Sequence, residues 1–429
     1  MGFSRRSGSA RGVRRALVPL VAAASLAGCW FQPGFDSHRS GHNGTERGLT
    51  GANVATLDQV WSVDLGSAAV LDPVVSRRGV HTVAGNMVHT RKLVDGTGMW
   101  SDTVIAPTNP EGENVVSSPS VRGSQVLVPA MSMPLDPPVA GTGVHVYDAA
   151  TGAESPLLAN VIAAQSVTVA GDTLVGNSLT HLIGFDYLSF IEVYDLLKRG
   201  PQYNWRSIHE MGGFDIQIVT PAAVGADRLA VGVGSRVEVY TRERPAGCQE
   251  PVPGAVFCPT VWERTFGARA TQPILSDDEE TVFVGDATGR FWSLAMADGA
   301  VRWQAVLSGA LVVAPPTVGD GVVYVAATDR IHAFDADGCG AATCSPLWSA
   351  PVPGGPITKQ PALAGGVLYV GTEDGSVLAF DADGCGAATC SPVWEASTGS
   401  SLITGGPIVA NGNLLVGTYD GRLIAYRPD

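Results

Sequence analysis

Residues 333–346 read AFDADGCGAATCSP, and residues 379–392 repeat the same fourteen letters. Each copy is followed two residues later by a tryptophan, Trp348 or Trp394. The offset between the copies is 46 residues, and most successive tryptophans of the chain lie 39 to 57 residues apart. A period of this length indicates a β-propeller or a similar array of repeated units. The earlier tryptophans of the series are Trp61, Trp100, Trp205, Trp262 and Trp303.

Each period contains a smaller pattern that predicts four short strands. A proline opens an apolar strand, as in Pro361-Ala362-Leu363, and a strand of alternating character follows at 367–372. A tight Asp374-Gly375 turn leads into a third strand at 376–381, and the tryptophan strand ends the unit. Four such strands form one antiparallel blade. Because a blade cannot bury both of its faces alone, successive blades are expected to pack around an axis.

Counting the units predicts an all-β fold, an eight-bladed β-propeller of four-stranded antiparallel blades that covers residues 55–429. The last unit, 403–427, has only three strands. A lone tryptophan strand near 61–65 precedes the first proline strand, and we expect it to supply the missing outer strand of the last blade. Pairing the two ends in this way removes a free sheet edge. A ring of seven blades is the alternative, because the repeat is poor near 157–205.

Composition excludes several other classes of protein. The chain has 429 residues with 53 Gly and 28 Pro, which argues against a helical bundle. The glycines have no three-residue period, so the chain is not collagen-like. A hydrophobic content of 45% is too high for a disordered chain. The net charge of −13 disfavours nucleic acid as a partner, because the phosphate backbone attracts a basic surface.

Residues 1–28 have the features of a signal peptide. Five arginines and no acidic residue lie within the first fifteen positions, and the apolar run that follows, 16–26, is too short to cross a bilayer. The run leads into Leu26-Ala27-Gly28-Cys29, which resembles the lipobox of bacterial lipoproteins. The resemblance implies cleavage before Cys29 and acylation of that residue. The membrane is therefore a predicted partner through the N-terminal lipid.

Residues 29–54 are rich in Gly, Ser, His and Asn, so we expect the lipidated cysteine to be followed by a flexible tether. The predicted location is outside the cytoplasm. The lipid would hold the exported protein at the outer side of the cytoplasmic membrane, or at an outer membrane if the cell has one.

Six cysteines follow Cys29, and they form three pairs that are close in sequence. An even number of closely spaced cysteines in an exported protein predicts disulfides. Zinc is the alternative, because two successive C-x4-C pairs offer four thiols. The usual zinc spacing is different, and each pair falls in its own repeat. The predicted disulfides are Cys248–Cys258, Cys339–Cys344 and Cys385–Cys390.

The pattern Asp-Ala-x-x-Gly followed by Trp is similar to the repeat of pyrroloquinoline-quinone-type (PQQ-like) β-propellers. It occurs as Asp148-Ala149-Ala150-Thr151-Gly152 and in the two long cysteine-containing copies. In that family the tryptophan docks between neighbouring blades. The resemblance implies this docking role for Trp61, Trp100, Trp205, Trp262, Trp303, Trp348 and Trp394.

Two branches of the PQQ-like family lead to different functions. Quinoprotein dehydrogenases bind the quinone and calcium, but this chain has no adjacent cysteines and no evident Asp, Asn and Glu cluster for a calcium shell. Non-catalytic lipoproteins, such as the propeller subunit of the outer-membrane barrel assembly machine, resemble it more. We therefore expect no enzyme activity and no cofactor, and a scaffold or binding module with a protein partner at the cell envelope. A quinoprotein dehydrogenase and a sensor that binds a carbohydrate or another ligand are the alternatives.

Two surfaces are candidates for binding that partner. Lys359 and Gln360 lie in a connection between blades, and we expect them at the mouth of the channel on a rigid scaffold. A solvated lysine without a ligand is the alternative. Tyr187 and Phe190 predict an exposed aromatic surface, unless they only fill the core of one irregular blade. The eight histidines are scattered along the sequence and form no catalytic or metal-binding motif. We therefore predict no catalytic residue and no metal site.

Overall fold

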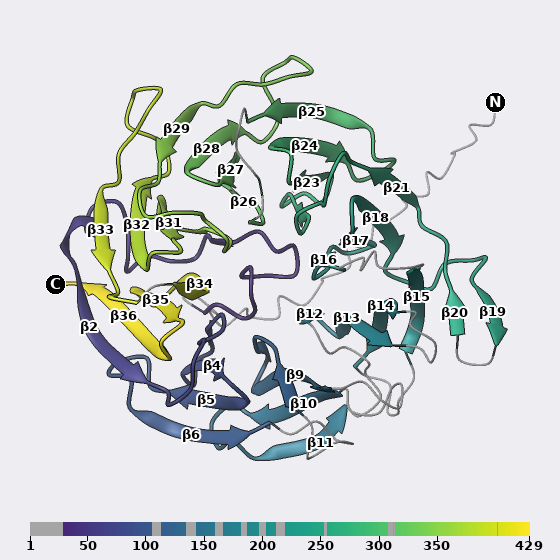
Figure 1. Cartoon of the computed structure of the whole chain (residues 1–429), viewed down its shortest axis with the longest axis horizontal. Helices are drawn as coiled ribbons and strands as arrows, with labels where there is room; N and C mark the ends of the chain where they lie inside the picture. Colours follow the sequence, from purple (N-terminus) through teal and green to yellow (C-terminus); the bar gives the residue numbers. More distant parts are fainter. Residues whose placement is uncertain are drawn as a thin grey trace, which may run out of the picture.

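The structure is a computed structural model that describes residues 29–104, 113–133, 143–158, 166–181, 187–196, 203–211, 219–252, 255–307, 312, 314–400 and 402–429. Strands are arranged around a central axis as eight antiparallel sheets, the blades of a propeller (Figure 1). The eight-bladed all-β fold is confirmed, and the alternative of seven blades is wrong. Within the described residues, no helix is long and apolar enough to cross a bilayer.

Blades 1 to 4 follow one another along the chain, and each runs from an inner strand at the axis to an outer strand at the rim. Blade 2 has an additional short strand beside its second strand, and blade 4 carries a two-stranded hairpin before its outer strand. The strands are β3 (Val74–Val75), β4 (Val80–Ala84), β5 (Met87–Arg91) and β6 (Gly98–Thr103) in blade 1; β7 (Glu113–Val116), β8 (Ser120–Arg122), β9 (Gln125–Met133), β10 (Gly143–Asp148) and β11 (Glu154–Leu158) in blade 2; β12 (Ser166–Ala170), β13 (Thr173–His181), β14 (Tyr187–Asp195) and β15 (Tyr203–Met211) in blade 3; and β16 (Ala223–Val224), β17 (Arg228–Val233), β18 (Arg236–Thr241), the hairpin β19 (Gln249–Val252) and β20 (Ala255–Phe257), and β21 (Trp262–Thr265) in blade 4.

Blades 5 to 7 repeat the pattern, and blade 8 combines the two ends of the propeller sequence. Its outer strand is β2, which pairs with β36 in register Trp61↔Ala425 and Val63↔Leu423. This pairing closes the ring (Figure 1). The strands are β22 (Ile274–Leu275), β23 (Thr281–Gly285), β24 (Arg290–Ala295) and β25 (Val301–Val306) in blade 5; β26 (Thr317–Gly319), β27 (Val322–Ala327), β28 (Arg330–Asp335) and β29 (Trp348–Pro351) in blade 6; β30 (Ala362–Ala364), β31 (Val367–Gly371), β32 (Ser376–Asp381) and β33 (Trp394–Ser397) in blade 7; and β34 (Ile403–Ala410), β35 (Asn413–Thr418), β36 (Arg422–Pro428) and β2 (Leu57–Asp64) in blade 8.

The second strand of a blade is buried on both faces, although its sequence suggested alternation. All five residues of β31 are buried. One core cluster joins Tyr324 and Ile331 of blade 6 to Leu368 and Phe380 of blade 7. Because each blade is covered by a neighbour on either side, the core of this propeller lies between the blades.

The repeated tryptophan and glycine form one contact between neighbouring blades. Six of the seven indoles of the series donate a hydrogen bond of 2.9 to 3.2 Å to a carbonyl of the next blade. Trp348 donates to Ala382, and a Cβ built on Gly384 would lie 2.6 Å from its ring. Gly384 also has φ +84°, which favours glycine. The motif therefore needs glycine where the indole of the preceding blade lies. Trp205 is in β15, and its side chain lies outside the described residues.

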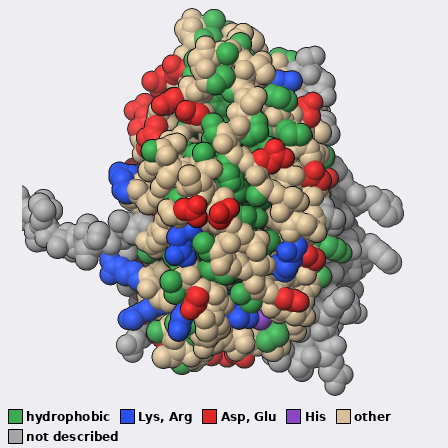
Figure 2. Space-filling view, turned by 90° about the vertical axis from the view of Figure 1, so that its left-hand side faces the viewer, with side chains coloured by type: hydrophobic (Ala, Val, Ile, Leu, Met, Phe, Trp, Pro, Cys, Tyr) green, Lys and Arg blue, Asp and Glu red, His purple; other side chains and the backbone are tan. Residues whose placement is uncertain are grey.

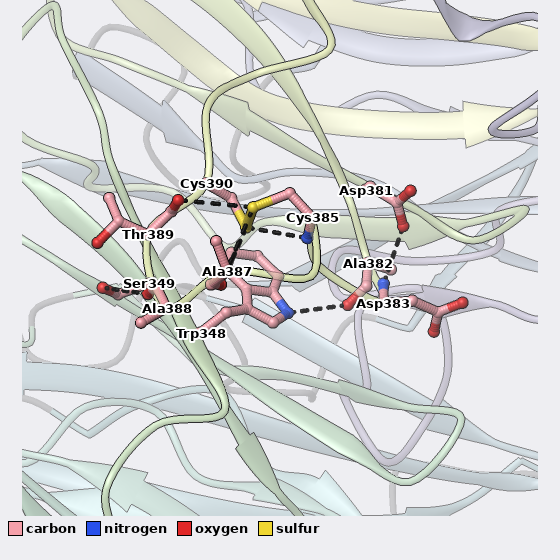
Figure 3. The surroundings of a disulfide bond; sticks show 10 residues. All are labelled: Trp348, Ser349, Asp381, Ala382, Asp383, Cys385, Ala387, Ala388, Thr389 and Cys390. Atoms are coloured by element: carbon pink, nitrogen blue, oxygen red, sulfur yellow. Dashed lines mark hydrogen bonds between the residues drawn. A yellow bond between two sulfur atoms is a disulfide. The ribbon is translucent and has the colours of Figure 1, made fainter.

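All three predicted disulfides are present, Cys248–Cys258, Cys339–Cys344 and Cys385–Cys390. The Cys385–Cys390 loop lies beside Trp348 of the preceding blade (Figure 3). Ser349 donates its backbone N–H to Ala388, and Cys390 donates its own back to Ser349. The Cys339–Cys344 loop pairs in the same way with Gln304. Each of these two loops thus covers the outer strand of the blade before it, which would otherwise be an open edge.

The segment 29–54 differs from the predicted flexible tether, because it packs across the ring (Figure 1). Trp30, Arg39 and Leu49 are each no more than 2% exposed. The short strand β1 (His42–Asn43) pairs with β30 of blade 7, and the 3-10 helix η1 (Val54–Thr56) leads into β2. This segment has the composition of a linker and is nevertheless buried, because its backbone and polar groups make the contacts with the blades.

Residues 30–43, which we call the collar, contact the inner strand of every blade in order. Carbonyl oxygens of the collar accept six hydrogen bonds from inner-strand N–H groups, and two side-chain amides contact the remaining two blades. These contacts satisfy backbone groups that face the axis and have no neighbouring strand. They join Trp30 to Val75, Phe31 to Val121, Gln32 to Val169, Ser37 to Val224, His38 to Leu275, Ser40 to Val318, Gly41 to Leu363 and Asn43 to Val409.

Candidate functional site

A cavity of about 280 Å³ lies on the ring axis, and we call it the axial well. Residues at the start of the inner strands of all eight blades line it, and collar residues contribute the rest of its wall. Because these residues belong to the connections between blades, the well opens on the face that those connections form, the loop face. The polar and charged lining residues are Arg39, Asp72, Ser118, Ser166, Gln272, Thr358, Lys359 and Gln360.

Lys359 and Gln360 both line the well, but they differ in their contacts. The Gln360 amide donates to the carbonyls of Arg39 and Pro316, each at 2.7 Å, so its N–H groups hold the collar. Lys359 is half-buried. Among the described residues, no hydrogen bond or ion pair is assigned to its ammonium group. Lys359 is thus the lining residue that can accept an acidic ligand group without breaking a contact.

Arg39 anchors the collar beneath the well. Its guanidinium is 2% exposed and donates to Thr168 Oγ1 at 2.6 Å and to the carbonyls of Val167 and Pro33. Burial lowers the pKa of Arg39 to about 10, while the negative charges of Asp72 and Asp36 oppose that change. The group therefore stays charged at neutral pH.

Asp72 balances part of this charge. Its carboxylate accepts hydrogen bonds from the Ser118 hydroxyl at 3.0 Å and from the Gly406 N–H at 2.7 Å. Blades 1, 2 and 8 are thereby joined at the wall of the well. With Arg39 and Lys359 against Asp72, the lining has an excess of positive charge in a chain of net charge −13.

Trp30 contributes a further donor. Its side chain is 2% exposed, packs edge-on against Phe35 and lines the well. Its indole N–H has no hydrogen-bond partner in the part of the chain that the structure describes. A buried donor without a partner costs about 1–3 kcal/mol.

The acidic turns of the loop face have a structural explanation. Asp374 accepts hydrogen bonds from the Thr372 hydroxyl and the Ser376 N–H of its own turn. Burial alone would raise the pKa of Asp374, but these hydrogen bonds bring it below its usual range. This carboxylate shapes its turn and is already engaged.

Sequence reasoning missed Arg39, Trp30 and Asp72 as residues of the site. The first two lie in the segment interpreted as a tether. For Asp72 a signal was available, because the residue before the repeated proline lines the axis in several blades. Asp72, Ser118, Gln272, Gln360 and Gly406 all precede such a proline.

The second candidate surface belongs to blade 3. Tyr187 and Phe190 are in β14, where Phe190 pairs with Ser178 and Ile208. Their side chains lie outside the described residues, so the predicted aromatic surface stays a prediction.

The well does not fit the calcium shell that the resemblance to quinoprotein dehydrogenases implies. Asp72 is the one acidic residue among the described lining residues, and both of its oxygens accept protein hydrogen bonds. In the described parts of the chain, no three His, Cys, Asp or Glu side chains are grouped so that they could hold a metal ion.

Comparisons with known proteins agree with the fold. No curated protein sequence matches the chain. The quinohemoprotein alcohol dehydrogenase ADHIIG from Pseudomonas putida HK5 has a TM-score of 0.67 and 13% identity, over 94% of this chain and 80% of that one. The corresponding enzyme from Comamonas testosteroni has a TM-score of 0.65 and 16% identity, over 94% and 81%. The computationally designed protein Ika8 has a TM-score of 0.62 and 14% identity, over 86% and 99%.

At such identities these likenesses describe the fold alone. The sequence itself is more informative in its second half, where residues 259–426 match the family described as "Outer membrane protein assembly factor BamB". That match spans the outer strand of blade 4, blades 5 to 7 and most of blade 8, the part in which the Trp and Gly contacts repeat without interruption. Residues 259–426 are therefore PQQ-like propeller repeats of the BamB type.

Proposed function

We propose that the protein is a non-catalytic, lipid-anchored propeller that acts as a scaffold or binding module at the cell envelope. The axial well is the observation that carries the proposal. All eight blades contribute to it, and the collar holds the inner strands at fixed positions around it. A rigid site of this kind is suited to binding. The three disulfides are typical of proteins outside the cytoplasm.

The chemistry of the well favours a partner that presents hydrogen-bond acceptors. Lys359 offers a positive charge, and with Arg39 it gives the lining an excess of positive charge over Asp72. A cavity of about 280 Å³ has room for one or two side chains. We propose that the well receives a protruding loop of a partner protein whose tip carries an Asp or Glu side chain.

Photo-crosslinking in cells tests this binding role. A photoreactive residue at Thr358, which is exposed beside the well, should trap one partner protein in the otherwise unchanged chain. Lys359→Glu should abolish the adduct, because the like charge repels the acidic loop. Arg302→Glu, the same charge reversal on blade 5 at a residue that does not line the well, is the control and should leave the adduct unchanged. An adduct that survives Lys359→Glu would contradict the proposed binding mode.

The proposed anchor has its own test. Intact mass measurement of the protein extracted from membranes should show an acylated N-terminal Cys29. Cys29→Ser should abolish the added acyl mass. A Cys29→Ser chain that still carries an acyl group, or an unchanged chain that carries none, would contradict lipid anchoring at this residue.

A further inference from the structure

We propose that blades 1 and 2 hold the protein against an anionic bilayer through the face opposite the axial well. The inference rests on the proposed lipid anchor at Cys29. It identifies the side of the disc that meets the membrane and the residues that contact its headgroups.

The predicted anchor, Cys29, lies directly beside the propeller in the chain. Cys29 is followed directly by Trp30, whose backbone N–H and C=O both bond to Val75, at 2.9 and 2.7 Å. Trp30 is also 2% exposed. Trp30, the residue directly after Cys29, is already packed into the propeller. A lipid on Cys29 would therefore hold the nearest face of the disc close to the bilayer.

The second step identifies that face. Val75 ends β3, and the Ser76–Gly79 turn that follows it leads to β4. Strand direction alternates within a blade, so the first-to-second and third-to-fourth strand turns lie together, opposite the loop face. We call this side the hairpin face. Arg77 of this turn is near enough to Cys29 to oppose the rise in the pKa of its thiol that burial causes.

The third step is the chemistry beside Cys29. A groove of about 530 Å³ runs over the turns of blades 1 to 3, with Phe31 and Phe35 of the collar in its wall. Three arginines surround these rings, and Arg77 and Arg78 are exposed. Arg122 bonds to Asp172 and to the carbonyl of Gly171, which holds it at the groove. Guanidinium groups bind phosphate well, and apolar rings such as those of Phe insert at the boundary between headgroups and acyl chains.

Charged residues are distributed unevenly over the hairpin face. Turns of blades 5 and 6 are acidic, whereas blade 1 carries Arg77, Arg78 and Lys92 in its turns and Arg91 at the end of β5, against the single acidic turn residue Asp95. Figure 2, which views the disc from the left-hand side of Figure 1, shows several Arg and Lys side chains with some Asp and Glu in its lower half, and a larger acidic group at the upper left. An anionic surface therefore attracts blades 1 and 2 and repels the opposite side of the ring. The acidic turn residues are Asp277, Asp278, Glu279, Glu280, Asp320, Asp335 and Asp337.

This orientation leaves the axial well accessible. The loop face points away from the bilayer, so Lys359 meets the partner and the anchor stays on the other side. The disc lies tilted, with blades 1 and 2 nearest the headgroups.

Two natural lysines report the orientation. Lys92 is exposed in the turn between β5 and β6 on the hairpin face, and Lys359 lines the well on the loop face. The acylated full chain is bound to vesicles of phosphatidylcholine and phosphatidylglycerol and treated with a membrane-impermeant amine reagent. Peptide mass spectrometry should show Lys92 labelling reduced several-fold relative to the detergent-dissolved protein, with Lys359 unchanged. Protection of Lys359, or equal labelling of both lysines, would overturn the proposal.

Variants separate this inference from the anchor itself. Arg77→Glu with Arg78→Glu should restore Lys92 labelling while the acylated chain still sediments with the vesicles. Without the acyl chain, the same change should weaken vesicle binding by more than about tenfold. Arg302→Glu, on blade 5, is the control and should change neither result. A chain that carries no acyl group by intact mass would contradict the proposed function, whereas a sedimenting chain with an unprotected Lys92 contradicts only the orientation.

Discussion

The rim and the axis of this propeller are held by different kinds of contact. At the rim, a tryptophan of one blade bonds to a carbonyl of the next and lies on its glycine, and this contact recurs from blade to blade. At the axis, one non-repeating segment contacts all eight inner strands through backbone and polar groups. Rim contacts are encoded by a periodic sequence, while axial contacts are encoded by a single stretch that resembles a linker.

The comparison shows why the two regions respond differently to mutation. A rim residue serves one pair of blades, so its loss is local and its free energy comes from buried apolar area. A collar residue lies between blades that are far apart in sequence. Its loss affects the positions of several inner strands and the shape of the axial well.

The largest effect is expected from a rim tryptophan. Trp303 is 2% exposed and donates to Ala336. Trp303→Ala should lower the free energy of unfolding by about 3–5 kcal/mol, because it leaves a large cavity between blades 5 and 6. Urea denaturation followed by intrinsic fluorescence measures the change. Arg302→Ala, at the neighbouring exposed position, should cost under about 0.5 kcal/mol, and a comparable loss in both variants would contradict the docking role.

The collar should respond to the loss of a single polar group. Arg39→Met keeps most of the side-chain volume but leaves Val167 and Thr168 without their donor. We expect a loss of about 1–3 kcal/mol, the cost of buried acceptors without a partner. Arg47→Met in the same segment is the matched control, because Arg47 is exposed and bonds only to nearby carbonyls. Equal thermal midpoints for the Arg39 variant and the unchanged chain would show that the collar does not stabilise the ring.

The disulfide loops also stabilise contacts between neighbouring blades at the rim. Replacing Cys385 and Cys390 by Ser should cost about 2 kcal/mol, the loss of loop-closure entropy for so short a loop. Amide exchange at Cys390 should rise at the same time, because its hydrogen bond to Ser349 depends on the shape of the loop. Unchanged exchange there would mean that the loop pairs with blade 6 without its disulfide.

As pH falls, the contacts within the blades should lose stability before the contacts at the axis do. Burial lowers the pKa of His81 to about 3, and its ring nitrogens bond to Ser76 and Thr90. In the unfolded chain the pKa is about 6.5, so between these values the unfolded state binds more protons and stability falls as pH falls. The loss attributable to His81 between pH 6.5 and pH 5 is about 2 kcal/mol. Arg39 keeps its charge over the same range.

Thermal melts at these two pH values measure the effect. His81→Gln should lower stability at neutral pH and reduce the further loss at acid pH. A variant that loses as much stability on acidification as the unchanged chain would show that the pH dependence comes from another group.

Much of the rim could be predicted from the sequence. A fourteen-letter repeat, a tryptophan period and paired cysteines are sufficient for eight blades and three disulfides, because each unit repeats the same local physics. The axis could not be predicted in this way. The buried Ser40 accepts a hydrogen bond at its carbonyl from Val318, and the buried Asn43 donates from its amide to Val409. Such contacts leave no hydrophobic period in the sequence.

The residues of the candidate site also differ in whether the repeat could predict them. Lys359 and Gln360 could be placed near the axis, because their repeat position relative to the proline strand was known. Arg39 and Trp30 could not, because no repeat unit places the segment that contains them.

Amide hydrogen exchange at the inner strands tests the collar most directly. The N–H groups of Val121, Leu275 and Leu363 donate to the collar carbonyls of Phe31, His38 and Gly41. The account predicts that these three amides exchange as slowly as amides inside the blades, and that replacing residues 30–43 by a Gly and Ser linker of equal length makes them exchange fast. Fast exchange of these amides in the unchanged chain would contradict the collar and restore the flexible tether.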